Sequence, residues 1–497
     1  MQRLILTAFC LFTSLPLSGQ FVYVANVNDN NISGYSVDAA TGVLTPVPGS
    51  PFATGTFPRS VTVDPTSRFV YVANLGDNNV SGYAINATGA LTSIPGSPFA
   101  AGGAPICITV DPKGRFAYVA NFTQQSISQY TIDASTGALI AGSSVSHVGS
   151  LQSLAVDPGG RFLYSTNAFL PASVTGFTID QSTGALSGIG AFLTGSLPLS
   201  VAADPTGRFV YAANSNDKDV SGFTINATTG TLTSIPGSPF SAESNPVFVA
   251  PDPTGRFVYV VNTGSDSISE YSVNATTGAL ATTTESPFRT ELRPQAMAVD
   301  PTGRFAYAGN GANNISAYAI DAASGALTPI PGSPFAAGSV PQSIAITSSP
   351  NIPFAEFEVR DLHIPCDRDD DDDRNDMRFR LNGEFTPGAA SKGIDPAHQA
   401  VTLGIGNFSL SIPAGMFKAN RDGDSFRFEG TINGANVEFE IRDEHSRRDR
   451  NRDDAPEFTF RVDGRGAELN RQPHSVKVSL MIANNTGSAS VKRGACG

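Results

Sequence analysis

The stretch Phe69-Val70-Tyr71-Val72-Ala73-Asn74 decides the fold of this chain, because close relatives of it recur through the first two-thirds of the sequence. The tyrosine of this stretch returns at intervals of 46 to 48 residues. A repeat of that length built from strands is typical of a β-propeller, in which each repeat forms one blade. We therefore expect an all-β fold that begins with a seven-bladed β-propeller. The recurring tyrosines are Tyr23, Tyr71, Tyr118, Tyr164, Tyr211, Tyr259 and Tyr307.

Each repeat has the pattern of four short strands, which in one copy are expected at 59–63, 69–74, 80–85 and 90–94. In other copies, at 111–115, 204–208, 252–256 and 300–304, an Asp-Pro-x-Gly-Arg turn joins the first two strands. Asp opens such a turn, Pro presets φ and Gly tolerates positive φ. The second strand is apolar on both faces, as expected for a strand covered by neighbouring blades. Residues found in every copy, such as Asn74, are expected to serve the blade itself.

The ends of the repeat array predict how the ring closes. The first copy begins at Phe21 and lacks an inner strand, whereas residues 341–346 match the inner strand at 294–299 but have no second strand after them. We expect 341–346 to pair with the first blade, which would close a propeller spanning 21–348 and leave no open edge at the junction.

The first 19 residues resemble a signal peptide. Arg3 precedes a largely apolar run from Leu4 to Phe12, and Ser18-Gly19 supply small residues at the end of the segment. The run is too short for a stable membrane anchor, so we expect no transmembrane segment in the mature chain. An extracytoplasmic location follows, whether secreted, periplasmic or at the cell surface; a misassigned start codon is the alternative interpretation.

Charge divides the chain in two. Charged residues make up 30 of the 330 residues from 21 to 350, but 45 of the 147 residues from 351 to 497. This change predicts a domain boundary near Ser349-Pro350. The net charge of −12 leaves neither part with the basic surface that nucleic-acid binding requires, so that class of function is excluded.

Residues 351–497 alternate apolar and charged positions, which predicts an antiparallel β-sandwich with a solvated face. Cys366 and Cys496 bracket this domain and form a possible disulfide, with two free thiols as the alternative. The acidic run Asp369 to Asp373 is a candidate calcium loop, but a solvated loop is favoured because it lacks EF-hand spacing. Cys107 is expected to be an apolar filler, and the sequence predicts neither a metal site nor a cofactor.

The Asp-Pro-x-Gly-Arg-Phe-x-Tyr-Val-x-Asn unit resembles the lactonase family of seven-bladed propellers, which includes 6-phosphogluconolactonases and other propellers with Tyr-Val-x-Asn repeats. The resemblance implies a lactone hydrolase that uses a base to activate water and cationic groups to hold an oxyanion. Family enzymes typically begin the inner strand with Pro-Arg-His. Here Pro58-Arg59-Ser60 has the arginine but not the histidine. The corresponding stretches at 105–107, 198–200, 294–296 and 341–343 have neither.

Polar residues that the repeat does not explain are the candidates for a site. Arg59 and Arg293 enter the blades on either side of the closing blade, so they are the predicted catalytic cations, with Glu291 as the predicted base. For the loop that carries Glu291 and Arg293, the plainer alternative is a solvated loop with a surface ion pair. For His147, the only histidine of the propeller, it is a surface side chain. The predicted ligand-binding residues are Arg289, His147 and Glu243, and acidic loops on the same face carry Asp29, Asp77, Asp217, Asp219 and Asp266.

Three functions fit this pattern. The first is an exported lactonase-like propeller that acts as a binding or interaction module, with a protein or carbohydrate ligand on its loop face. The second is a lactone hydrolase with a displaced site around Arg59 and Arg293, acting on a small lactone. The third is a structural protein of the cell surface. A channel with converging cations and carboxylates would favour the enzyme, whereas a channel lined by small and apolar residues would favour the binder.

Overall fold

The computed structural model describes residues 19–147 and 149–348 of a first compact unit, Met1–Pro350. In a second unit, Asn351–Gly497, it describes eleven strands between residues 352 and 492 and a few residues next to them. Each unit is all-β in the described residues, as the sequence predicts. No helix in the described part of the chain is long and apolar enough to cross a membrane.

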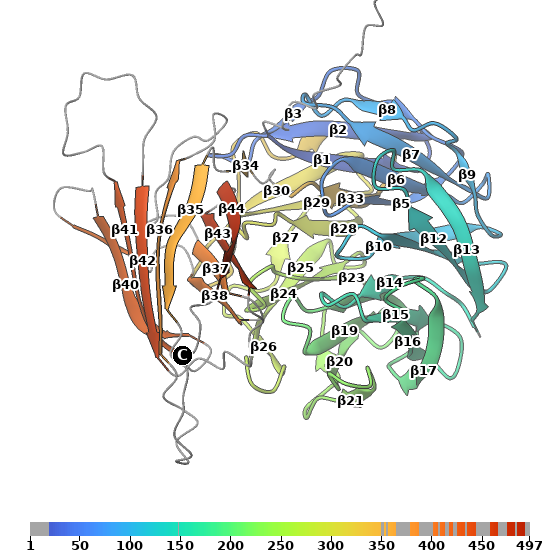
Figure 1. Ribbon diagram of the computed structural model, residues 1–497. Helices are drawn as coiled ribbons and strands as arrows, with labels where there is room; N and C mark the ends of the chain where they lie inside the picture. The colour runs from blue at the N-terminus through green and yellow to red at the C-terminus, as the bar shows by residue number, and fades with distance from the viewer. Residues whose placement is uncertain are drawn as a thin grey trace, which may run out of the picture. The chain divides into compact units, whose positions relative to one another are not determined.

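Residues 20–346 form seven antiparallel sheets arranged as the blades of a propeller (Figure 1). We number the blades in chain order, with the sheet that contains β1 as blade 1. The innermost strands are β33 (Pro341–Ile346), β5 (Pro58–Val63), β10 (Pro105–Val110), β14 (Leu154–Val156), β18 (Pro198–Ala203), β23 (Pro246–Pro251) and β28 (Pro294–Val299). The second strands are β1 (Gln20–Asn26), β6 (Phe69–Asn74), β11 (Phe116–Asn121), β15 (Phe162–Asn167), β19 (Phe209–Asn214), β24 (Phe257–Asn262) and β29 (Phe305–Asn310).

The third strands run back toward the Asp-Pro-x-Gly-Arg face of each blade. They are β2 (Asn31–Val37), β7 (Asn79–Ile85), β12 (Ser126–Ile132), β16 (Ser173–Ile179), β20 (Asp219–Ile225), β25 (Ser267–Val273) and β30 (Asn314–Ile320). All second strands are buried along their whole length, because the next blade covers each face.

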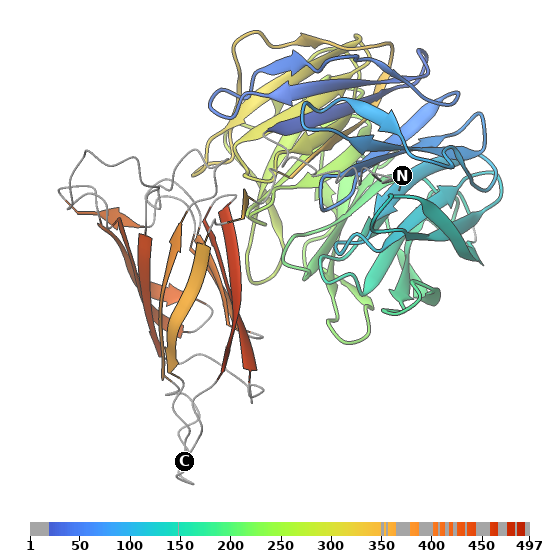
Figure 2. The same ribbon diagram turned by 45° about the horizontal axis from the view of Figure 1, so that its top comes forward.

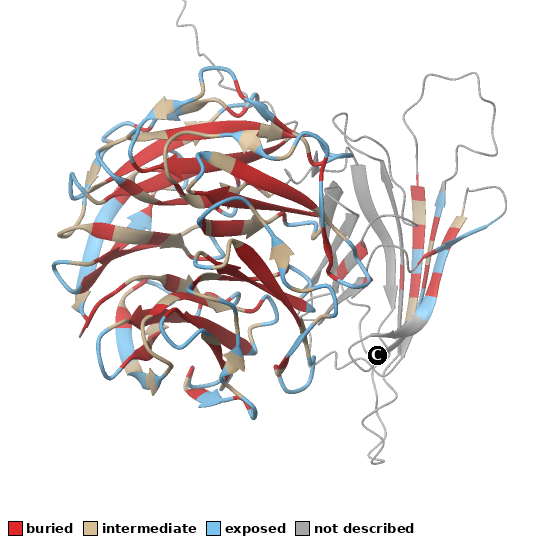
Figure 3. Cartoon of the chain, turned by 180° about the vertical axis from the view of Figure 1, so that it is seen from behind, coloured by how far each residue is buried: buried red, intermediate tan, exposed pale blue. Residues whose placement is uncertain are grey.

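The outer edge of the blades has two forms. In five blades a proline-containing loop splits the edge into a three-residue and a two-residue strand, both paired with the third strand. In blades 3 and 4 the edge is one unbroken strand of eight residues, β13 (Leu139–Ser146) or β17 (Leu186–Leu193), and most of its residues are exposed (Figure 3). The split edges are β3 (Leu44–Pro46) with β4 (Phe52–Ala53), β8 (Leu91–Ser93) with β9 (Phe99–Ala100), β21 (Leu232–Ser234) with β22 (Phe240–Ser241), β26 (Leu280–Thr282) with β27 (Phe288–Arg289), and β31 (Leu327–Pro329) with β32 (Phe335–Ala336).

Blade 1 joins the two ends of the propeller. β33 pairs antiparallel with β1, with Ile344 opposite Val24. Beyond the strand, the Phe21 amide donates to Thr347 Oγ1 at 2.8 Å and the Thr347 amide donates to the Phe21 carbonyl at 2.9 Å. The last inner strand therefore completes the first sheet, and the ring has no open edge at this junction.

The repeated tyrosine holds neighbouring blades together. Tyr71, fully buried in β6 of blade 2, donates its hydroxyl hydrogen to the Gly137 carbonyl in a turn of blade 3 at 2.7 Å. Tyr307 of blade 7 makes the same bond to Gly42 of blade 1, which continues the series across the closing junction. Burial raises the pKa of these tyrosines, so the hydroxyl stays protonated and remains a donor. The other bonds are Tyr23 to Gly89, Tyr118 to Gly184, Tyr164 to Gly230, Tyr211 to Gly278 and Tyr259 to Gly325.

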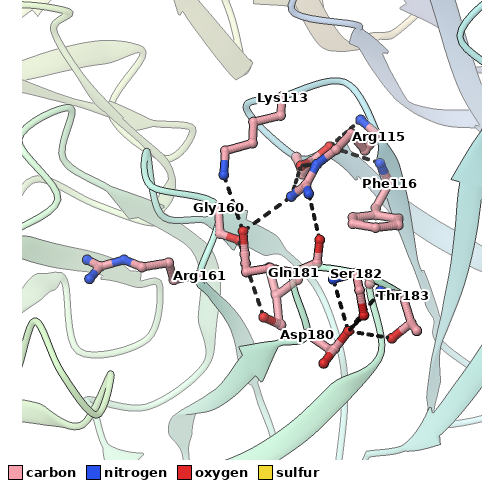
Figure 4. Close-up of polar contacts among 12 residues, drawn as sticks. Lys113, Arg115, Phe116, Gly160, Arg161, Asp180, Gln181, Ser182 and Thr183 are labelled. Carbon is pink, nitrogen blue, oxygen red and sulfur yellow. Dashed lines mark hydrogen bonds and ion pairs between the residues drawn. The ribbon is translucent and has the colours of Figure 1, made fainter. Parts of the chain in front are cut away.

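The Asp-Pro-x-Gly-Arg turn adds a second tie between blades. In blade 3, Asp111 Oδ1 accepts hydrogen bonds from the Arg115 and Phe116 amides, and the Arg115 guanidinium lies 4.8 Å from the centre of the Phe116 ring. Arg115 also donates to the Gln181 carbonyl of blade 4 at 2.7 Å (Figure 4). The repeated arginines are therefore structural, as their presence in successive copies predicts.

The second unit contains two sheets, which lie face to face in Figures 1 and 2. Buried Phe428 and Phe439 both contact Phe417, and Val462 is also buried, so the described core fits the predicted sandwich. One sheet has β34 (Ile352–Pro353), β44 (Asn485–Lys492), β43 (Ser475–Ile482), β37 (Val401–Ile405) and β38 (Phe408–Ile412); the other has β35 (Glu356–His363), β36 (Arg378–Thr386), β42 (Phe458–Arg465), β41 (Ala435–Asp443), β40 (Ser425–Ile432) and β39 (Lys418–Ala419).

Several predictions for the second unit fall on residues that the structure does not describe. Cys366, Cys496 and the run Asp369 to Asp373 lie outside the described residues, as do the first 18 residues of the chain. Among the residues that are described, no group of three or more His, Cys, Asp or Glu side chains is placed to hold a metal ion.

Candidate functional site at the inner strands

In six inner strands the second residue, and in blade 4 Gln152 just before β14, occupies an equivalent place around the centre of the propeller. Adjacent inner strands contact one another in a closed series, and all seven side chains at this level are half-buried. One side of the ring is polar, with Gln295, Gln342 and Arg59 on successive blades. The remaining residues at this level are Ile106, Gln152, Leu199 and Val247.

Hydrogen bonds join the polar side into one chain. Arg59 Nη1 donates to Gln342 Oε1 at 3.2 Å, and Gln342 Nε2 lies 3.5 Å from Gln295 Oε1. Gln295 Nε2 in turn donates to the Arg293 carbonyl at 3.2 Å. Every bond runs in the same direction, so Arg59 is the cationic end of a series of donors. We call these three side chains the Arg59–Gln342–Gln295 chain.

Arg59 is less satisfied than an arginine in a structural ion pair. Its Nε is buried and has no hydrogen-bond partner, and no described carboxylate forms a salt bridge with it. Burial lowers the pKa of its guanidinium, because removal from water disfavours the charged form. A guanidinium remains charged at any physiological pH, so this group suits an anionic or strongly polar ligand that would supply the missing acceptors.

The structure places the other predicted catalytic residues outside this chain. Arg293 is the last residue of the β27–β28 loop, with φ of 55°, and its amide donates to Asp266 Oδ1 at 2.7 Å. Its side chain is exposed, and only its carbonyl enters the Arg59–Gln342–Gln295 chain. Glu291 is exposed as well, and none of the described hydrogen bonds or ion pairs joins its carboxylate to Arg59.

The predicted ligand-binding residues divide into exposed and buried side chains. Arg289 and Glu243 are exposed, and Arg289 uses its carbonyl to accept the Tyr318 hydroxyl. The interpretation of His147 as a surface histidine is wrong, because its side chain is only 4% exposed. Its Nε2 lies 2.9 Å from Ser165 Oγ, and burial lowers its pKa to about 4. His147 is thus a neutral, buried side chain at neutral pH.

Four of the five aspartates in the acidic loops bind the loops that connect successive blades. Asp29 accepts the Ser339 amide, Asp77 accepts the Thr56 amide and Asp217 accepts the Ser196 amide, each across a loop junction. Asp266 accepts the Arg293 amide in the same way, whereas Asp219 accepts Asn214 Nδ2 within blade 5. These carboxylates therefore have defined structural partners, as tight-turn aspartates do.

Comparison with known proteins assigns the propeller to a family. Four overlapping segments, residues 14–108, 94–191, 149–251 and 235–341, match the family described as "Lactonase, 7-bladed beta-propeller". Together they cover more than half of the chain. The chain belongs to the lactonase family. No curated protein matches the sequence at a significant level.

Solved structures with the same fold extend this result. The lactonase-family propeller is similar to a candidate 6-phosphogluconolactonase from Bacteroides fragilis, with a TM-score of 0.59 and 20% identity over 67% of this chain and 98% of that one. It is also similar to the periplasmic gluconolactonase PpgL from Pseudomonas aeruginosa, with a TM-score of 0.57 and 20% identity over 67% and 99% of the two chains. A Lactobacillus plantarum protein matches with a TM-score of 0.56 and 19% identity over 66% and 99%. At these identities the likeness concerns the fold alone.

The third residue of the inner strand has a structural role in this lactonase-family chain. The Ile108 amide donates to Ser60 Oγ at 3.2 Å, which joins β10 to β5. The Val61 amide donates to Ser343 Oγ at 3.1 Å, and so joins β5 to β33. Serine at this place, where the family resemblance leads one to look for histidine, therefore links adjacent blades. Two further bonds of this kind run from Val201 to Ser153 and from Val249 to Ser200.

Sequence reasoning missed one buried acid in the propeller. Glu270 in β25 has no exposed surface, and neither carboxyl oxygen has a hydrogen-bond partner. Burial is the main reason that its pKa rises to about 7, with nearby Glu285 and Asp321 acting in the same direction. The signal was present in the repeat, because four other blades have glycine at this position, as in Ser81-Gly82-Tyr83.

Proposed function

We propose that this lactonase-family propeller is a binding module whose Arg59–Gln342–Gln295 chain contacts an anionic sugar such as an aldonate. The observation that carries the proposal is the half-buried Arg59 guanidinium, which lacks a carboxylate partner among the described residues. It donates to Gln342, whose amide in turn lies 3.5 Å from that of Gln295. Guanidinium and amide donors in one row match the carboxylate and hydroxyl oxygens of a sugar acid. The apolar residues at the same level, Ile106, Leu199 and Val247, fit the carbon face of such a ligand.

Binding is favoured over hydrolysis because hydrolysis needs a base near the reacting carbonyl. No described carboxylate or imidazole is hydrogen-bonded into the Arg59–Gln342–Gln295 chain. Glu291 remains solvent-exposed, and His147 is buried against Ser165. A lactone hydrolase is the second candidate, supported by the family and by the gluconolactonase names of two structural relatives. In that case Arg59 would stabilise the oxyanion and a loop carboxylate would activate water.

Titration calorimetry of the full chain with D-gluconate tests the proposal. Replacing Arg59→Ala removes a charge-assisted hydrogen bond, so affinity should fall about 10- to 100-fold. Arg59→Lys should recover part of the loss, because it restores the charge without the planar pair of donors. Arg293→Ala is the matched control and should leave affinity within about threefold of the parent, since its side chain is exposed.

Two results would contradict the proposal. One is the absence of gluconate binding by the parent protein. The other is an equal loss in the Arg59→Ala and Arg293→Ala proteins, which would move the ligand to the exposed loops. Circular dichroism of each variant establishes that the propeller is folded before the comparison is made.

We also propose that the protein is exported. The apolar run from Leu4 to Phe12 supports this, and one structural relative is named as periplasmic. Fusing residues 1–19 to a reporter that is active only outside the cytoplasm tests the point. An active reporter supports export, whereas an inactive one that regains activity with a known signal peptide contradicts it.

A further inference from the structure

Blade 4 and the edge of blade 3 form a nearly uncharged sector of an acidic protein. Between residues 134 and 203 the Asp, Glu, Lys and Arg residues are Asp157, Arg161 and Asp180, whereas the whole chain carries a net charge of −12. All three serve turns: Asp157 accepts the Arg161 amide, Arg161 donates to the Ala227 carbonyl, and Asp180 accepts the Ser182 amide. We call residues 134–203 the neutral sector.

The neutral sector also contains both unbroken blade edges. Among the described strands β17 pairs only with β16, so the outer side of its backbone has no strand partner. A bulge near Gly188 and Gly190 interrupts its register with β16, and the regular part that follows is Gly190–Leu193. In the other blades, by contrast, a proline-containing loop splits the edge. An uncharged edge without proline is a template for the addition of another strand.

Exposed apolar side chains gather at the same end of this edge. Six large hydrophobic side chains are exposed among the described residues, and four of them, including Ile140, belong to the neutral sector. Leu170 is 84% exposed, Leu193 is 72% exposed and Phe169 is 56% exposed. The β15–β16 loop that carries two of them ends at Ser173, whose partner in the sheet is Leu193. Phe169, Leu170 and Leu193 therefore form a blade-4 patch beside the free end of β17.

We propose that two copies of this chain associate through β17, antiparallel to its own copy across a two-fold axis. A two-fold interface sets the same surface against itself, so a charged edge would meet like charges there. β17 has no charged residue, and the neutral sector lets two chains of net charge −12 approach with their acidic regions apart. Association covers the open backbone of Gly190–Leu193 and buries the blade-4 patch.

Sedimentation velocity of the full chain tests this dimer. From about 1 to about 100 μM the parent protein should shift from monomer to dimer, because association depends on protomer concentration. Leu193→Lys places like charges on both sides of the two-fold and should weaken dimerisation at least about tenfold. Leu292→Lys is the matched control, since Leu292 is 62% exposed but lies in the β27–β28 loop between blades 6 and 7, outside the neutral sector, and it should dimerise as the parent does.

Hydrogen exchange supplies a second measurement that needs no variant. Amides of the 186–193 segment should exchange more slowly at high protein concentration than at low concentration, while the split edge at 91–93 should not change. A parent protein that is monomeric throughout this range overturns the proposal. So does a Leu193→Lys protein that is folded and dimerises as the parent does, because the interface would then lie elsewhere on the chain.

Discussion

Blades 2 and 6 share their strand order and their ties to the next blade, yet they differ at two facing positions in the core. Blade 2 has Gly82 with Ile94, and a methyl group added at Gly82 would meet the side chains of Ile94 and Phe99. Blade 6 has Glu270 in place of the glycine and Thr283 in place of the isoleucine. The smaller threonine leaves room for the larger acid, so the blade keeps its shape.

This difference shows that, at these two core positions, the repeat preserves the combined side-chain volume more strictly than the polarity. Both Glu270 carboxyl oxygens and Thr283 Oγ1 are buried without partners, a cost that Gly82 and Ile94 do not carry. The repeated tyrosines hold both blades in the ring all the same. Positions common to all blades thus stabilise the propeller, and positions that break the repeat carry its unusual chemistry.

The largest expected effect comes from removing the inter-blade tyrosine that blades 2 and 6 share. Tyr71→Ala and Tyr259→Ala each remove a fully buried ring and an inter-blade hydrogen bond, so each should lower the free energy of unfolding by about 4 kcal/mol. Urea unfolding followed by circular dichroism measures this. A cost below about 1 kcal/mol in either blade would contradict the role given to the tyrosine.

The next effect is a pH dependence of the unfolding free energy that arises from blade 6 and not from blade 2. Glu270 has a folded pKa of about 7 against 4.5 for a free side chain, so between these values the folded chain holds a proton that the unfolded chain releases. The contribution of Glu270 to stability therefore falls as pH rises from about 4.5 to 7, by up to about 3 kcal/mol. Glu270→Gln should remove this slope, as Gln129 shows that a glutamine fits the equivalent place in blade 3.

His147 must be controlled for in this experiment because its slope has the opposite sign. Burial lowers the pKa of His147 to about 4. Between about pH 6.5 and 4 the histidine is therefore protonated in the unfolded chain but neutral in the folded chain. Its contribution to stability is lost as pH falls from about 6.5 to 4, which offsets Glu270 in the parent. Unfolding free energies at pH 5 and pH 7.5 should thus differ more in Glu270→Gln than in Glu270→Gln with His147→Gln. Equal pH profiles for parent and Glu270→Gln would refute the account of Glu270.

The smallest expected effect comes from giving blade 6 the glycine and isoleucine that blade 2 has at positions 82 and 94. Glu270→Gly alone leaves a gap, and Thr283→Ile alone crowds the acid, whereas the double variant restores the pair found in blade 2. The double variant should be more stable than the sum of the single changes by about 1 kcal/mol, since the two side chains share one space. A double-mutant cycle in urea at pH 7.5 measures the coupling, and strict additivity would mean that the two positions do not interact.

Most of the fold could be predicted from the repeat. Strand identity, the structural role of Asn74 and the pairing of 341–346 follow from the period and from the inner strand missing at Phe21. The Asn74 side chain does bond within its blade, to Asn79 and Ser81, and β33 does pair with β1. These features depend on local pattern and chain continuity, which a sequence displays directly.

The site was less accessible to such reasoning. Arg59 was found because it interrupts a repeat, but Gln295 and Gln342 become significant only when the ring sets three inner strands side by side. His147 was expected at the surface because it falls in a loop, but it is buried and its ring contacts Ser165 of the next blade. Glu270 was overlooked because a charged residue in an alternating strand suggests a solvated face.

Lactone hydrolysis tests the central claim, that this propeller binds through Arg59 without a hydrolytic base. The measurement is the rate of acid release from glucono-1,5-lactone and 6-phosphogluconolactone with the parent and the Arg59→Ala proteins. The account predicts the spontaneous rate with both proteins, together with gluconate binding that is about 10- to 100-fold weaker in Arg59→Ala than in the parent. A rate above the spontaneous one that Arg59→Ala abolishes would contradict it and establish a lactonase.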